Sequence, residues 1–147
     1  MRSDAVHTSL VVQVAWMDTK LLASTLYSGS TIPGRGPYKH TGPVSRPAAR
    51  TLVAAFNSGF LMTSANGGCY TDGKTILPLR NGAASFVIYR NGTAGILAWD
   101  HGAAMPPDVV AVRQNLDLLV NHGKPIPGLN PDDSTHWGFT LVNAVYV

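Results

Sequence analysis

The run SFVIYRNGTAGILAW, residues 85–99, carries the strongest structural signal in the chain. Its two arms, Ser85–Arg90 and Thr93–Trp99, are rich in aromatic, β-branched and aliphatic residues, and the dipeptide Asn91-Gly92 separates them. Asn-Gly favours the positive backbone angles of a type I′ turn, which matches the twist of two antiparallel strands. The sequence therefore predicts an antiparallel β-hairpin here, although Asn91-Gly92-Thr93 also has the form of a glycosylation sequon.

The segment that follows the hairpin has apolar residues at helical spacing. These residues run from Val109 to Val120, with Asp108 in front as a possible N-cap and Gly123 behind as a terminator. The pattern predicts a helix over this segment. Arg113 and Asp117 lie four residues apart, which on a helix is the spacing of a surface ion pair.

The rest of the chain gives weaker predictions. Leu10–Trp16 is apolar on both alternating faces, as in a buried strand, and Leu21–Tyr27 is a candidate partner strand. Ser28–Pro47 is rich in proline and glycine and predicts a long surface loop, either a binding loop or a mobile insertion. Ala48–Phe56 fits a helix or a strand, and Phe139–Val147 is strand-like.

Composition places the chain among single globular domains. Of its 147 residues, 45% are hydrophobic and 13% are charged, so one domain over residues 1–147 is expected. The net charge of +3 comes from scattered lysines and arginines, which argues against a basic stripe for nucleic acid. No apolar run is long enough to span a membrane, and the N-terminal residues lack a signal-peptide pattern. We expect an α+β fold, with a mixed or antiparallel sheet and one or two packed helices.

Few residues suggest chemistry by themselves. None of the five histidines has another at metal-ligand spacing, so we expect neither a metal nor an organic cofactor. The single Cys69 excludes an internal disulfide, and we interpret it as a small buried hydrophobe rather than a nucleophile. The turns at Asn57–Phe60, Asn66–Gly68 and Asp72-Gly73 could bring backbone amides close to an anion, or could be simple turns.

Three blocks of sequence carry a resemblance to a known family. They read AAFNSGF (54–60), ANGGCYTDGKTILPLRNGAASFVIYRNGT (65–93) and PDVVAVRQNLDLLVNHGKPIPGLN (107–130). Together they resemble the phosphodiester glycosidase family, which includes the enzyme that removes N-acetylglucosamine from a mannose 6-phosphate diester. The upstream VQVAWMDTKLLASTLYSGS (12–30) looks like the N-terminal part of actinobacterial members.

The resemblance implies a hydrolase that cleaves a sugar-1-phosphodiester, with a sugar-phosphate or glycan as its small-molecule partner. Relatives are exported, so it also implies a secreted protein. It identifies no catalytic residue. In the implied site Asn57 orients the sugar or phosphate. Arg113 is the first candidate for binding phosphate charge and Arg80 the second, although a structural ion pair is the alternative for each arginine. The implied substrate-binding residues are Asn57, Gly59, Phe60, Arg80, Arg113 and Asn115.

The chain also departs from the family pattern. Cys69 stands where the family usually has an aromatic residue, and Ser134–Gly138 lacks an expected arginine. The family's later aspartate-containing block would fall beyond Val147. These departures predict an incomplete domain that lacks its C-terminal block, and they keep open two alternatives to an active hydrolase. One is a non-catalytic carbohydrate or cell-envelope binding module, and the other is an inactive fragment.

Overall fold

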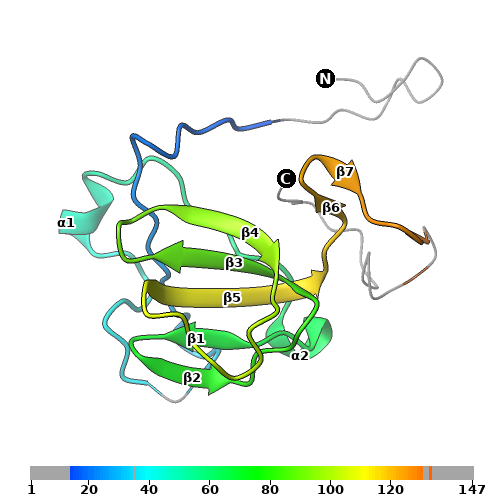
Figure 1. Cartoon of the computed structure of the whole chain (residues 1–147). Coiled ribbons are helices and arrows are strands. Elements are labelled where there is room, and N and C mark those ends of the chain that lie inside the picture. Colours follow the sequence, from blue (N-terminus) through cyan, green and yellow to red (C-terminus); the bar gives the residue numbers. More distant parts are fainter. Residues whose placement is uncertain (1–13, 35, 131–132, 134–147) are drawn as a thin grey trace.

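A five-stranded antiparallel sheet forms the body of the protein in the computed structural model, which describes residues 14–34, 36–130 and 133 (Figure 1). The strand order is β2-β1-β5-β3-β4, and every neighbouring pair is antiparallel. The predicted α+β class with an antiparallel sheet is therefore confirmed. The elements are α1 (Arg46–Ala49), α2 (Met62–Ala65), β1 (Cys69–Thr71), β2 (Lys74–Leu77), β3 (Ala83–Tyr89), β4 (Ala94–Ala98), β5 (Val109–Asp117), β6 (Val120–Asn121) and β7 (Lys124–Pro125).

The predicted hairpin is confirmed as β3 and β4, but its turn differs from the type I′ prediction. Gly92 has a φ of 87°, whereas Asn91 does not adopt a positive φ. The Asn91 side-chain oxygen accepts hydrogen bonds from the backbone N–H of Thr93 at 3.0 Å and from its hydroxyl at 2.7 Å. This local Asx contact stabilises a longer loop, closed by a Gly92 N–H bond to the carbonyl of Tyr89. Type I′ geometry occurs instead at Asp72-Gly73, where both φ angles are positive.

The predicted helix over residues 109–120 is wrong, because this segment forms the central strand β5. It pairs with β1 on one side and with β3 on the other. Val109, Val110 and Val112 are β-branched and pack well on a pleated surface, and both alternating faces of the first half of β5 are buried, as Ala111 and Val112 show. The apolar spacing fitted a helix by coincidence. The Arg113–Asp117 ion pair is wrong for the same reason, since four residues along a strand span roughly 13 Å.

The N-terminal strand prediction also fails over the residues that the structure describes. Val14–Trp16 is not a strand, and the Trp16 side chain is 82% exposed. Leu21–Tyr27 contains no strand, and it contacts the hairpin through one bond from the Ser24 N–H to the Gly92 carbonyl. Residues 10–13 and the strand-like 139–147 lie outside the described residues.

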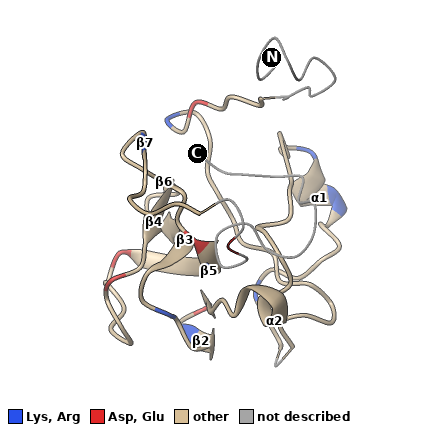
Figure 2. Cartoon of the chain, turned by 90° about the vertical axis from the view of Figure 1, so that its right-hand side faces the viewer, with Lys and Arg blue, Asp and Glu red and all other residues tan. Residues whose placement is uncertain are grey.

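The proline-rich segment at residues 28–47 is a loop, as predicted. Its described part contains one isolated bridge, between Ser28 and Thr41, before α1 begins at Arg46. The ambiguous Ala48–Phe56 supplies the end of α1 and continues without regular structure, with Val53 71% exposed. No helix in the described ranges has the length and apolarity needed to cross a bilayer. Figure 2 shows lysines and arginines on separate elements of the fold.

One cluster of the core surrounds the side chain of Trp99, which is 1% exposed. It packs with Val87 from β3 and with Val109 and Val112 from β5. The Trp99 indole N–H donates to the carbonyl of Gly102 at 2.9 Å, so this buried polar atom is satisfied. The core therefore anchors the middle of β5, and the polar second half of that strand lies at the same end of the sheet as α2 (Figure 1).

Candidate functional site

Four of the six predicted site residues meet where the turn after Phe56 crosses β5. The backbone N–H of Phe60 donates to Oδ1 of Asn115 at 3.3 Å, and a guanidinium N–H of Arg113 donates to the carbonyl of Phe60. Gly59 has a φ of 125°, and a Cβ there would lie 2.5 Å from the Asn115 amide nitrogen. We call Gly59, Phe60, Arg113 and Asn115 the Phe60–Arg113 cluster. More than fifty residues of chain separate its two halves.

Arg113 is the buried charge of this cluster, with 6% of its surface exposed. Besides the carbonyl of Phe60, its guanidinium donates to the carbonyl of Gln114. Charge-assisted bonds to two carbonyls offset part of the cost of burying the guanidinium. Arg113 therefore fixes the Phe60 turn against β5, and its positive charge lies beneath that turn.

Gln114 connects the cluster to the neighbouring loops, and sequence reasoning missed it. Its side chain is fully buried, and its Oε1 accepts from the backbone N–H groups of Gly68 at 3.0 Å and Arg80 at 2.7 Å. Its Nε2 donates to the Arg80 carbonyl at 2.9 Å and to the Ser85 hydroxyl at 3.0 Å. If residues 109–117 are assigned to a strand, alternation places Gln114 on the same face as Val112. This alternation was the sequence signal that could have identified Gln114 as a buried residue.

Arg80 is held through its backbone by the side chain of Gln114, which alternation places on the face of β5 opposite to the side chains of Arg113 and Asn115. One guanidinium nitrogen of Arg80 contacts Oδ1 of Asp117 at 2.9 Å, and both side chains are about one-third exposed, at 36% and 35%. The Nε of Arg80 is buried and has no hydrogen-bond partner among the described residues. The ion pair therefore leaves part of the Arg80 guanidinium accessible at the end of the sheet. Asn57, the remaining predicted residue, is exposed in the segment that leads to Gly59.

The Asn66–Gly68 turn packs against protein backbone. A Cβ on Gly67 would lie 2.6 Å from the carbonyl oxygen of Gln114, and one on Gly68 would lie 2.3 Å from that of Pro78. Asn66 ends α2 in the left-handed conformation, with a φ of 48°. Gly67 therefore lets the end of α2 approach β5 closely, and Gly68 lets the start of β1 approach the backbone of Pro78 and Leu79, so both have a structural role.

Cys69 lies opposite Arg113 in the β1–β5 register and is 1% exposed. Burial raises the pKa of its thiol above the usual 9.0, and the nearby Arg113 charge partly opposes this rise. Because the thiolate is the reactive form, a buried thiol with a raised pKa is inert at neutral pH. The prediction of a small buried hydrophobe agrees with this position.

We expect Cys69 to resist iodoacetamide in the folded protein at pH 7.5 and to react fully in urea, as measured by intact mass. Since its folded-state pKa exceeds the unfolded value, the protonated thiol stabilises the fold fully below pH 9.0. That contribution decreases as the pH rises through the folded-state pKa. Urea melts of Cys69→Ala should lack this alkaline decrease, and rapid labelling of the native protein would contradict the assignment.

No group of three or more histidine, cysteine or acidic side chains in the described ranges is placed to hold a metal ion. The groups of the Phe60–Arg113 cluster are the buried Arg113 guanidinium, the backbone turn at Gly59 and Phe60, and the Asn115 amide. Comparisons with protein-family models, curated proteins and solved structures found no match to this chain.

Proposed function

We propose that this chain is a phosphodiester glycosidase-type domain that acts on a sugar-1-phosphodiester. The observation that carries the proposal is the convergence of the Phe60–Arg113 cluster. The resemblance to that family rests on three blocks, and the first and third of them, which are distant in sequence, contact one another through Phe60, Arg113 and Asn115. Residues that were grouped by pattern alone and then meet at one point support a common site.

Arg80 is the residue we assign to the phosphate. Its guanidinium is partly accessible, whereas Arg113 is buried and donates to two backbone carbonyls. A guanidinium binds phosphate oxygens through a planar fork of N–H donors. Arg113 holds the Phe60 turn against β5, and we assign it a structural role in this proposal.

The reaction in this proposal is hydrolysis at the anomeric carbon. The bond between C1 of the sugar and the bridging oxygen breaks, and that oxygen leaves with the phosphate as a monoester. Water supplies the new hydroxyl at C1, and its second proton is released. Negative charge increases on the departing phosphate in the transition state, so a cation at that position lowers the barrier.

Arg80→Ala is expected to lower kcat/KM for N-acetylglucosamine-1-phospho-6-mannose by about 100-fold to 1,000-fold, the usual cost of one charge-stabilising donor. The measurement is release of N-acetylglucosamine. Thermal stability should change little, because the lost pair with Asp117 is partly exposed and such pairs contribute about 0–1 kcal/mol. Arg90→Ala is the matched control, since the exposed Arg90 donates to the carbonyl of Pro107 instead. Equal rates for both variants would overturn the assignment of Arg80.

A non-catalytic sugar-phosphate binding module is the second candidate. Its support is that the buried guanidinium of Arg113 is engaged by backbone carbonyls, as in a site built for binding and rigidity. This candidate predicts that the diester binds, that Arg80→Ala weakens binding, and that no sugar is released. Calorimetry and the hydrolysis assay on the same preparation separate the two. If the unsubstituted protein neither binds nor cleaves the diester, both candidates fail.

A further inference from the structure

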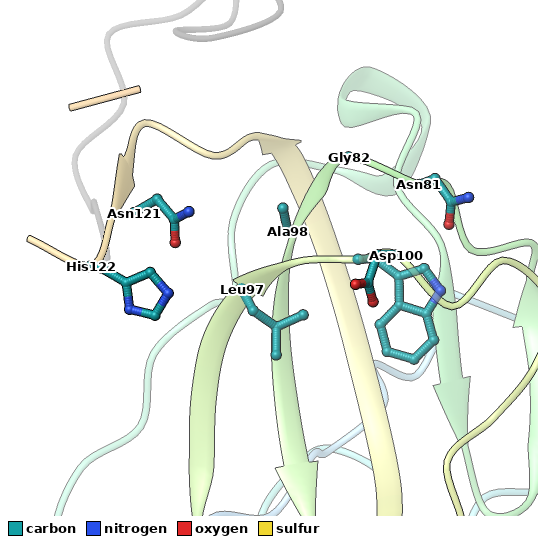
Figure 3. Close-up of a pocket in the computed structure, with 8 residues that line it drawn as sticks. Asn81, Gly82, Leu97, Ala98, Asp100, Asn121 and His122 are labelled. Carbon is teal, nitrogen blue, oxygen red and sulfur yellow. The ribbon is translucent and has the colours of Figure 1, made fainter. Parts of the chain in front are cut away.

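A cavity of about 560 Å³ lies between the end of β4 and the β6–β7 hairpin (Figure 3). This volume falls within the range of roughly 300–1,000 Å³ that small-molecule sites occupy. None of its residues belongs to the Phe60–Arg113 cluster. The cavity is lined by Asn81, Gly82, Leu97, Ala98, Trp99, Asp100, Asn121 and His122.

One wall comes from the tight turn between β6 and β7. Asn121 pairs with Lys124, and the two residues between them, His122 and Gly123, have φ angles of 49° and 73°. Two consecutive positive φ angles match a type I′ hairpin, a conformation that suits glycine but is uncommon for histidine. The turn carries the amide of Asn121 and the imidazole of His122 to one side of the opening (Figure 3).

The facing side combines an apolar surface with one carboxylate. Leu97 and Ala98 supply the apolar part, and the Asp100 side chain is 80% exposed. Oδ1 of Asp100 lies 3.3 Å from Nε2 of His101. Although Trp99 lines the cavity, it is 1% exposed and packed in the core, so it offers almost no ring face to a ligand.

This lining selects one chemical class of ligand. None of the described lining residues is a lysine or arginine, which disfavours an anion. The buried Trp99 gives an aromatic ligand no stacking surface. A purely apolar ligand would displace water from the amides, the imidazole and the carboxylate without replacing the lost hydrogen bonds. The Asn121 amide and the His122 imidazole can donate to and accept from hydroxyls, and the Asp100 carboxylate can accept from them, whereas Asn81 Oδ1 already accepts from the Gly102 N–H at 2.9 Å. Leu97 and Ala98 suit the C–H face of a sugar ring. We propose that this cavity binds a neutral, unphosphorylated sugar.

The cavity lining adjoins Arg80 in the sequence, which connects the cavity to the phosphate site; this step rests on the proposed function. Asn81 and Gly82 of the lining directly follow Arg80, and Ala83 pairs with Asp117, the ion-pair partner of Arg80. On the proposed function, we place the neutral sugar of a diester whose phosphate contacts Arg80 in this cavity. Sugar binding itself requires no catalysis and can be tested separately.

The test is a titration of the whole protein with N-acetylglucosamine, followed by amide chemical shifts in ¹⁵N NMR spectra. We expect shifts confined to the lining, and about tenfold weaker binding in His122→Gly, which keeps the turn and removes the imidazole. Asp100→Asn should also weaken binding. Its control is Asp72→Asn, a charge-matched change in a separate cavity of about 550 Å³ that is lined by Lys39, Asp72 and Arg90 among others.

Three results would overturn the sugar site: no shifts in the lining, equal weakening in the Asp72 control, or competition by inorganic phosphate. These results differ from a failure of the proposed function, which concerns turnover of the diester. Sugar binding without turnover would support the cavity and leave the binding module as the function. Turnover of the diester without chemical-shift changes in the lining on addition of free sugar would support the hydrolase and reject the cavity as a sugar site.

Discussion

Gln114→Leu is expected to destabilise the protein by about 3–5 kcal/mol, because each buried group left without a partner costs about 1–3 kcal/mol. Leucine fills a similar volume but can neither accept from the Gly68 and Arg80 N–H groups nor donate to the Arg80 carbonyl and the Ser85 hydroxyl. Natural domains are stable by only about 5–15 kcal/mol, so this is a large fraction of the total. Urea unfolding followed by circular dichroism measures it.

Ser85→Ala provides a graded control for that prediction. It removes one of the four side-chain hydrogen bonds of Gln114 and the bond from the Ser85 hydroxyl to the Ala83 carbonyl. The bonds from the Gly68 and Arg80 N–H groups to Gln114 Oε1 stay in place. We expect a loss of about 1–2 kcal/mol, clearly smaller than in Gln114→Leu. If the two variants unfold at the same urea concentration, the backbone contacts of Gln114 contribute little, and its role as the connector of the loops is wrong.

The contrast between β3 and β5 shows what sequence patterns could and could not predict. The hairpin was predictable because Asn91-Gly92 and its flanking β-rich arms are local signals. β5 was not, since Val109–Val120 fits a helical period, and its strand conformation depends on pairing with β1 and β3, which lie far away in the sequence. Apolar periodicity cannot separate a buried strand from a buried helix, and tertiary pairing decided the outcome.

The residues of the candidate site likewise fall into those that the sequence predicted and those that it did not. Gly59, Phe60, Arg113 and Asn115 were predicted from a family pattern, which carries long-range information that composition and spacing lack. Gln114 was missed because its hydrogen bonds join two loops, at Gly68 and Arg80, to β3 at Ser85, and these segments come together only after the sheet has formed. The same holds for the sugar cavity, whose walls combine residues 81–82, 97–100 and 121–122.

Gly68→Ala is expected to cost about 3 kcal/mol or more, at or above the upper end for overpacking a core. An added Cβ would lie 2.3 Å from the Pro78 carbonyl oxygen and 2.7 Å from the Leu79 Cα. These are backbone atoms, so no side-chain rotation relieves the clash. Any shift of Gly68 also disturbs its N–H bond to Gln114 Oε1 and its carbonyl bond from the Gln114 N–H. Thermal melts measure the loss.

Gly95→Ala is the matched control, because it adds the same methyl group to β4 in a position where no described heavy atom lies within 4 Å of the new Cβ. Its strand backbone suits alanine, so stability should hold or rise by about 0.5–1 kcal/mol. A tolerated Gly68→Ala would mean that β1 does not lie closely against Pro78. In that case the path from Gly68 through Gln114 to Arg80, and with it the placement of the Arg80 backbone, loses its geometric basis.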